Sequence, residues 1–215
     1  MRFSVCLLCK LWLPSTVSSF SAKHLVTLPP LSAGLLSHEL ISHCALPWRR
    51  SGKTHPLWPY GSSQRGARFT PLGGFATYYL ASDIYTASAE VLNQLWLPGS
   101  PPPPVRHPPL VFFTIDGMLE RVLDLTDGAI QAAVGSSLAE LTGDWPFTQA
   151  QGRLSPTQLL AQVAFDTGTL LGSRSVSSKN PPGTGVAVFA DRLIPGQPSR
   201  LRIYDPYGSL VQDIP

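Results

Sequence analysis

The stretch GGFATYYLASDIYTASAEVLNQL occupies residues 73–95 and decides the fold. Its segment Phe75–Ala81 is rich in aromatic residues and follows a glycine pair, which predicts a buried strand that leaves a turn. Asp83 can cap the helix that the next residues predict over 85–95, because apolar residues recur there at helical spacing. The sequence therefore predicts a strand that runs directly into a helix.

Further strand and helix signals follow in mixed order. A clear helix is predicted from Ser155, an N-cap residue before Pro156, to a stop at Gly168. Mixed order of this kind favours an α+β fold over a repeating βαβ pattern. The other predicted elements are strands at 110–115, 122–125, 169–171, 185–189 and 201–204, and a short helix over 128–134 capped by Thr126 or Asp127.

The composition is that of a globular protein. Of the 215 residues, 43% are hydrophobic and only 13% are charged, unlike a disordered chain. Signals for regular structure become dense only after about residue 45, so we predict a domain over 41–215. Residues 1–40 are predicted to be a leader of unknown structure. A weak secretory signal, a disordered leader and a misassigned start remain alternatives for it.

Several function classes are disfavoured by the residue pattern. The formal charge is only +3 and Lys and Arg form no run, so direct binding of nucleic acid is not expected. Cys6 and Cys9 form a lone CxxC, and no HExxH pattern is present, so no metal site is expected. No apolar run approaches the length of a membrane span, and neither a GxSxG elbow nor a GxxxxGK phosphate loop appears.

The segment from Trp48 to Glu90 concentrates arginines and tyrosines around one acid on an apolar helix face, Glu90. A half-buried carboxylate is costly unless it is paired or used in chemistry, and pairing with Arg68 is the structural alternative. Arginines can hold a diphosphate, an aromatic face can stack on a flat ring, and a carboxylate can stabilise an oxocarbenium-like sugar. These residue types together suit chemistry on a dinucleotide.

An ordered set of motifs over most of residues 45–195 resembles the RES domain, a family named for Arg, Glu and Ser. The resemblance implies an α+β fold similar to ADP-ribosyltransferases and an NAD+-degrading toxin of a toxin–antitoxin module. The motifs are Trp48-Arg49-Arg50, Gly66-Ala67-Arg68-Phe69-Thr70-Pro71, Tyr78-Tyr79-Leu80-Ala81, Ala89-Glu90-Val91, Val122-Leu123-Asp124-Leu125, Ser155-Pro156-Thr157-Gln158 and Val186 to Leu193.

The resemblance also implies roles for particular residues. Glu90 and Arg49 are expected to be catalytic, and Arg49 and Arg68 are expected to hold the phosphates of NAD+. Tyr79 is expected to pack on the substrate near nicotinamide, and Ser155 to line the pocket, although Ser155 is also explained as a helix cap. NAD+ is then a substrate, and no cofactor or metal is expected. The expected setting is the cytoplasm, with an Xre-type antitoxin as partner, a possible homodimer and no membrane.

Two departures from the family pattern leave alternatives open. The chain has Gly66-Ala67-Arg68-Phe69-Thr70 where the family commonly has Gly-Gly-Arg-Trp-Asn, and a later serine motif appears only loosely over residues 174–178. Ser175, Ser177 or Asn180 can take the polar role of that motif. Hydrolysis and phosphorolysis of NAD+, ADP-ribosylation of a protein, and a catalytically weak module that docks on a DNA-binding antitoxin are the functional alternatives.

Overall fold

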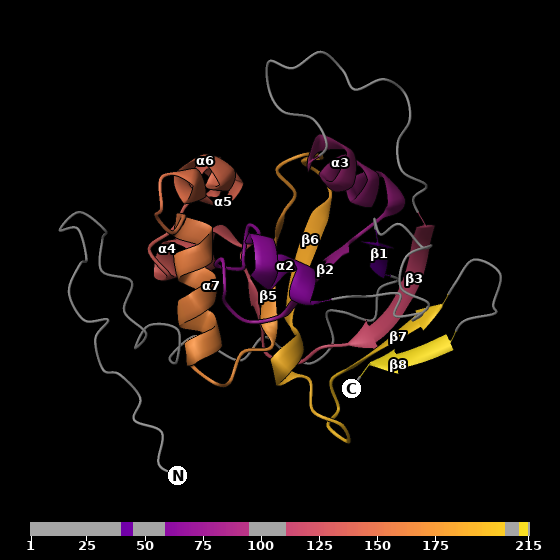
Figure 1. The fold of residues 1–215 in the computed structure, drawn as a ribbon. Coiled ribbons are helices and arrows are strands. Elements are labelled where there is room, and N and C mark those ends of the chain that lie inside the picture. Colours follow the sequence, from indigo (N-terminus) through magenta and orange to yellow (C-terminus); the bar gives the residue numbers. More distant parts are fainter. Residues whose placement is uncertain (1–39, 45–58, 95–110, 205–210, 215) are drawn as a thin grey trace, which may run out of the picture.

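The computed structural model describes residues 40–44, 59–94, 111–204 and 211–214. Within these residues eight strands form one sheet in the order β4-β5-β6-β2-β1-β3-β7-β8, and the fold is α+β, as predicted (Figure 1). Neighbouring strands are antiparallel except for β4 and β5, which are parallel. The strands are β1 (Leu40–Cys44), β2 (Thr77–Ala81), β3 (Val111–Met118), β4 (Val122–Asp124), β5 (Gly172–Val176), β6 (Thr184–Phe189), β7 (Arg200–Tyr204) and β8 (Val211–Ile214).

The helices lie at the faces and ends of this sheet. Figure 1 shows α4 to α7 gathered on the left of the molecule. Helix α3 lies to the right of the upper end of β6 (Figure 1). No helix in the described part of the chain combines the length and the apolar character that a membrane crossing needs. The helices are α2 (Tyr60–Arg65), α3 (Ile84–Gln94), α4 (Gly128–Ala133), α5 (Leu138–Thr142), α6 (Trp145–Ala150), α7 (Pro156–Asp166) and the short 3-10 helix η1 (Ala190–Arg192).

Alternating residues of the central strands supply two separate clusters of the core. Leu80 of β2 pairs with Val186 of β6, and both belong to a cluster with the apolar residues of β3 and β7. Ala187 and Phe189 point to the opposite face, where they pack with apolar residues of α7. Because side chains alternate along a strand, one strand serves both clusters. Phe69 and Tyr79, which border the candidate site described below, belong to the cluster under α7.

The predicted helix caps are confirmed where the sequence placed them. The Asp83 carboxylate accepts a hydrogen bond from the Thr86 amide at the start of α3, and Asp127 caps α4. Ser155 begins α7 in a capping box with Gln158, and the helix stops before Gly168, whose φ is +72°. These side chains satisfy amides that a helix start leaves without a partner.

Two predicted strand boundaries are wrong. The strand predicted at 169–171 lies at Gly172–Val176, because the polar sequence GSRSV is held between β4 and β6. The strand predicted to end at Ile115 continues to Met118, since Asp116 and its neighbours pair with β7. The elements β1, α2, α5, α6 and β8 were not predicted. Whether the domain spans 41–215 stays a prediction.

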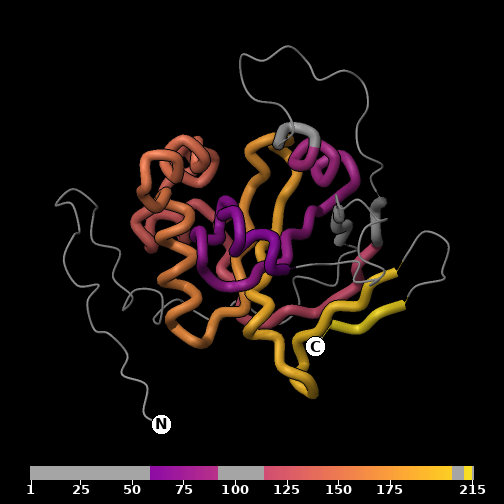
Figure 2. Tube along the Cα trace, in the orientation of Figure 1, coloured from indigo at the N-terminus to yellow at the C-terminus, as the bar shows by residue number. Residues whose placement is uncertain are grey.

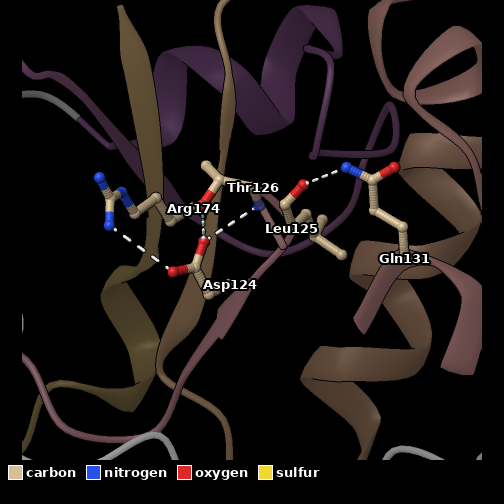
Figure 3. Close-up of polar contacts among 5 residues, drawn as sticks. All are labelled: Asp124, Leu125, Thr126, Gln131 and Arg174. Carbon is tan, nitrogen blue, oxygen red and sulfur yellow. Dashed lines mark hydrogen bonds and ion pairs between the residues drawn. The ribbon is translucent and has the colours of Figure 1, made fainter. Parts of the chain in front are cut away.

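The parallel pair β4–β5 is fastened by a polar cluster around Asp124 (Figure 3). Arg174 of β5 lies with its Nη1 3.6 Å from Asp124 Oδ2, and the other carboxylate oxygen of Asp124 accepts from the amide and hydroxyl of Thr126. Gln131 of α4 donates to the Leu125 carbonyl at 2.8 Å. The ion pair joins β5 to β4 beside their backbone pairing, and the loop that follows β5 carries the serines of the candidate site.

Ser173 in β5 gives a prediction about stability. Its hydroxyl is buried and has no hydrogen-bond partner among the residues that the structure describes, and its strand neighbours Leu123 and Ala187 belong to the cluster under α7. A buried hydroxyl without a partner costs free energy, so Ser173→Ala is expected to stabilise the fold by about 1 kcal/mol. For a chain of this size the melting temperature then rises by about 2–4 °C, which a thermal unfolding experiment measures.

Ser199 provides the matched control. It is also buried, but its hydroxyl accepts a hydrogen bond from the Glu120 amide at 2.9 Å. Ser199→Ala removes that partner and is expected to lower the melting temperature. A fall of similar size for Ser173→Ala contradicts the prediction.

Candidate active site

Arg68 lies at the tip of a tight turn between α2 and β2. Ala67 and Thr70 face each other across this turn, and the amide of each donates to the carbonyl of the other, at 2.8 and 3.1 Å. Arg68 and Phe69 are therefore the two central residues of a turn closed by two hydrogen bonds. Phe69 is buried in the cluster under α7, so the turn is anchored by its side chain as well.

The guanidinium of Arg68 joins two parts of the molecule that are distant in sequence. Nη1 donates to the carbonyl of Leu141 at 2.8 Å and to that of Gly143 at 3.0 Å, where α5 ends. Nη2 donates to Ser178 Oγ at 2.7 Å, in the loop that follows β5. Arg68 is partly buried, and these three contacts fix the orientation of its planar group.

Tyr79 of β2 supports this turn through its hydroxyl. The hydroxyl accepts from the Phe69 amide at 3.0 Å and shares a hydrogen bond of 2.8 Å with Thr70 Oγ1. Thr70 in turn donates to Thr77 Oγ1 in the same strand as Tyr79. Burial raises the pKa of Tyr79 above its ordinary value, so the phenol is neutral near pH 7. The tyrosine therefore holds the Arg68 turn against the sheet.

Glu90 lies on α3 and is held by Ser177. Ser177 Oγ donates to Glu90 Oε1 at 2.6 Å, and it accepts from the amides of Lys179 and Asn180 at 3.2 and 3.0 Å. A hydroxyl has one hydrogen and two acceptor positions. Because both acceptor positions are used by backbone amides, the hydrogen of Ser177 is directed to Glu90. The carboxylate is thus fixed at one oxygen.

The loop after β5 is fitted to α3 by a second set of contacts. Asn180 Nδ2 donates to Thr86 Oγ1 at 2.9 Å, and Thr86 Oγ1 donates to Asp83 Oδ2 at 2.7 Å. Gly183 packs against the Thr86 side chain, so closely that a Cβ at position 183 would be 1.8 Å from Thr86 Oγ1. Of the three residues left open by the sequence, Ser177 contacts Glu90, Asn180 supports the loop, and Ser175 is buried in β5.

Arg68 and Glu90 are thus brought together by consecutive residues, Ser178 and Ser177. Burial lowers the pKa of Arg68 from its ordinary value, and the negative charge of Glu90 raises it again. A guanidinium stays protonated at neutral pH in spite of such a shift. The site therefore presents a fixed cation beside a fixed carboxylate. This pair can hold an anionic group of a ligand and stabilise positive charge that develops next to it.

The family follows from a comparison with models of known protein families. The model of the RES domain matches residues 46–205. The chain belongs to the RES domain family. No curated protein sequence matches the chain.

A solved structure supports the same fold for this RES domain. A chain of the crystal structure of the M. tuberculosis MbcT–MbcA toxin–antitoxin complex is similar to it with a TM-score of 0.62. The two chains are 20% identical, and the similarity covers 89% of this chain and 90% of the other. At this identity the similarity concerns the fold.

Arg49 and Ser155 are the other two site residues predicted for the RES domain. Arg49 lies outside the described residues. Ser155 is buried, its hydroxyl accepts from the Gln158 amide at 3.2 Å, and it shares a hydrogen bond with Thr157 Oγ1. In this structure Ser155 acts as the cap of α7. Its contact with NAD+ stays a prediction.

Two residues that build the site were not predicted. Ser178 binds the Arg68 guanidinium, and its only signal in the RES domain sequence is its place beside Ser177 after a strand. Gln158 lies in the motif that begins at Ser155, but its side chain contacts the Arg68 turn 88 and 91 residues away in sequence. A contact of this kind leaves no local pattern.

Proposed function

We propose that this RES domain protein is an NAD+-degrading toxin of a toxin–antitoxin module. It cleaves the bond between nicotinamide and ribose, with water or inorganic phosphate as the acceptor. The observation that carries this proposal is the anchoring of Arg68 and Glu90 on the consecutive serines 178 and 177. A dinucleotide with an anionic diphosphate and a sugar that becomes cationic needs both charges close together.

Arg68 supplies the binding of the diphosphate. Its contacts with Leu141, Gly143 and Ser178 use three of the five N–H groups of a guanidinium. Among the described residues, the other two N–H groups have no recorded partner and are available for phosphate oxygens. Because the protein contacts hold the guanidinium plane, little conformational entropy is lost when the ligand binds.

Glu90 acts at the reacting sugar. As the bond between nicotinamide and ribose breaks, its electron pair moves to the nicotinamide nitrogen and the ribose gains positive charge. The carboxylate of Glu90 stabilises this charge electrostatically. Water or phosphate then forms the new bond to the same carbon, and when water attacks, Glu90 accepts its proton. Nicotinamide leaves as a neutral molecule, so no acid is needed to expel it.

The role as a toxin rests on the family and on the fold. The structural neighbour comes from a toxin–antitoxin complex. We therefore propose that an antitoxin of the Xre type binds this chain and blocks the site, and that the chain can form a homodimer. Because NAD+ is the proposed substrate, the proposed place of action is the cytoplasm.

The test is incubation of the purified protein with NAD+, with and without inorganic phosphate, followed by mass spectrometry of the products. Free ADP-ribose or a phosphorylated ADP-ribose supports the proposal and identifies the acceptor. ADP-ribose attached to a protein favours a protein ADP-ribosyltransferase instead. Intact NAD+ in the presence of folded protein contradicts the proposal and favours a module that only docks on its antitoxin.

Ser177→Ala tests how Glu90 is held. The change removes the hydrogen bond to Glu90 and leaves the amides of Lys179 and Asn180 without their acceptor. We expect kcat for NAD+ consumption to fall about 10–100-fold with a smaller change in KM, because Glu90 acts mainly in the transition state. Steady-state kinetics measure both constants.

Ser178→Ala is the neighbouring comparison. It removes a contact of Arg68 and leaves the bond between Ser177 and Glu90 intact. The expected result is a rise in KM with a smaller change in kcat, because Arg68 binds the substrate before and during the reaction. Equal effects of the two substitutions on kcat and KM contradict the division of roles between the serines.

A further inference from the structure

Gln158 at the start of α7 is a completely buried amide with contacts to the Arg68 turn. Its exposed fraction is 0%, and its Nε2 lies 3.1 Å from the carbonyl of Ala67 and 3.3 Å from that of Thr70. These two carbonyls are the ones that close the turn around Arg68. The amide of Gln158 therefore contacts the turn on both sides of the arginine.

The other end of the Gln158 side chain is fixed as well. Its Oε1 accepts from the Ser155 amide at 3.0 Å as part of the capping box. The orientation of the amide is therefore set: the oxygen faces the helix start and the nitrogen faces the turn. A buried amide is costly unless its groups are hydrogen-bonded, and here both ends are.

A second glutamine extends this support to the residues before Arg68. Gln149 of α6 accepts from Gln158 Nε2 at 2.9 Å and donates to the Arg65 carbonyl at 2.9 Å. Gly66 has a φ of +75°, and a Cβ at this position would be 1.9 Å from Gln149 Oε1. Only glycine has both the conformation and the space that this packing requires. Figure 2 shows the segment with the Arg68 turn running beside α7.

We propose that Gln158 is a positioning residue that fixes the turn of Arg68 and so directs the guanidinium into the site. The orientation of Arg68 matters for activity only if Arg68 binds NAD+, so this inference rests on the proposed function. Gln158 does not touch the substrate in this proposal. It acts through the carbonyls of Ala67 and Thr70, and Gln149 assists it at Arg65.

The test substitutes Gln158 with methionine, which keeps the length of the side chain and removes its hydrogen bonds. We expect KM for NAD+ to rise about tenfold with a smaller change in kcat, because a misdirected Arg68 weakens substrate binding. In an Arg68→Lys background the same substitution is expected to change KM little, since the guanidinium that it orients is gone.

Two control variants on α7 separate this role from a loss of stability. Gln162→Met changes a glutamine one turn further along, whose side chain donates to Asp166. Ala164→Gly weakens the helix in the core and leaves the hydrogen-bonding groups of Gln158 in place. Thermal unfolding ranks the variants by stability. If Ala164→Gly raises KM as much as Gln158→Met at equal loss of stability, the inference is overturned.

Hydrogen exchange of the Ala67 and Thr70 amides tests the inference without a measurement of enzymatic activity. Exchange at these two amides is expected to be at least about tenfold faster in Gln158→Met than in either control, because their mutual hydrogen bonds open more easily. Unchanged exchange overturns the role of Gln158. If the wild-type protein consumes no NAD+, the proposed function fails, and the exchange rates alone decide whether Gln158 holds the turn.

Discussion

Glu90→Gln is expected to reduce kcat for NAD+ consumption by about 10²–10³-fold, the usual effect of removing one group that stabilises charge in a transition state. Glutamine keeps the size of the side chain, and its amide oxygen can still accept the hydrogen bond from Ser177. The fold is therefore retained while the negative charge is lost. The measurement is the initial rate of NAD+ consumption by purified protein, together with growth of bacteria that express each variant.

Glu140→Gln is the matched control for this substitution. Glu140 is an exposed carboxylate on α5 that accepts a hydrogen bond from Ser136. The Glu140→Gln variant is expected to keep wild-type activity and to arrest growth like the wild type, whereas the Glu90→Gln variant allows growth. A Glu90→Gln variant that consumes NAD+ at the wild-type rate removes Glu90 from the mechanism.

Arg68→Lys has the second large expected effect. Lysine keeps the positive charge but lacks the planar fork, so it cannot reach Leu141, Gly143 and Ser178 together and still face a phosphate. The loss of several hydrogen bonds to a charged group predicts a fall in kcat/KM of about 100-fold or more, mostly through KM. Titration of the protein with ADP-ribose, measured by calorimetry, reports the same loss as weaker binding.

Arg153→Lys controls for a general effect of exchanging arginine for lysine. Arg153 is exposed and is hydrogen-bonded to Gln151 in the turn before α7. We expect its substitution to leave ADP-ribose binding unchanged. If both variants bind ADP-ribose like the wild type, Arg68 has only a structural role between α5 and the loop after β5.

The parts of the fold that the sequence predicts are those with a strong local pattern. The aromatic strand β2, the Asp83 cap and the capped helix α7 were all located, because apolar spacing and cap residues are read within a few positions. Strand β5 was misplaced by a few residues. Its sequence GSRSV has little apolar character, and its position is fixed by β4 and β6, which lie far away in sequence.

The candidate site divides in the same way. Arg68, Tyr79 and Glu90 have residue types and motifs that indicate their chemistry, and the structure brings these three together. No pattern in the sequence distinguished the two serines that contact Arg68 and Glu90 from the polar residues around them. Ser178 meets Arg68 across 110 residues and Ser177 meets Glu90 across 87, so only the tertiary fold defines these contacts.

The anchors of the two charged groups belong to neighbouring residues of one loop. Neighbouring Cα atoms are about 3.8 Å apart in a trans peptide, and that length cannot stretch. A shift of this loop therefore carries both attachment points with it, and the spacing between cation and carboxylate is expected to tolerate substitutions in the surrounding helices better than an insertion between Ser177 and Ser178. The fixed length of one peptide unit thus sets the distance between the two anchor points of the site.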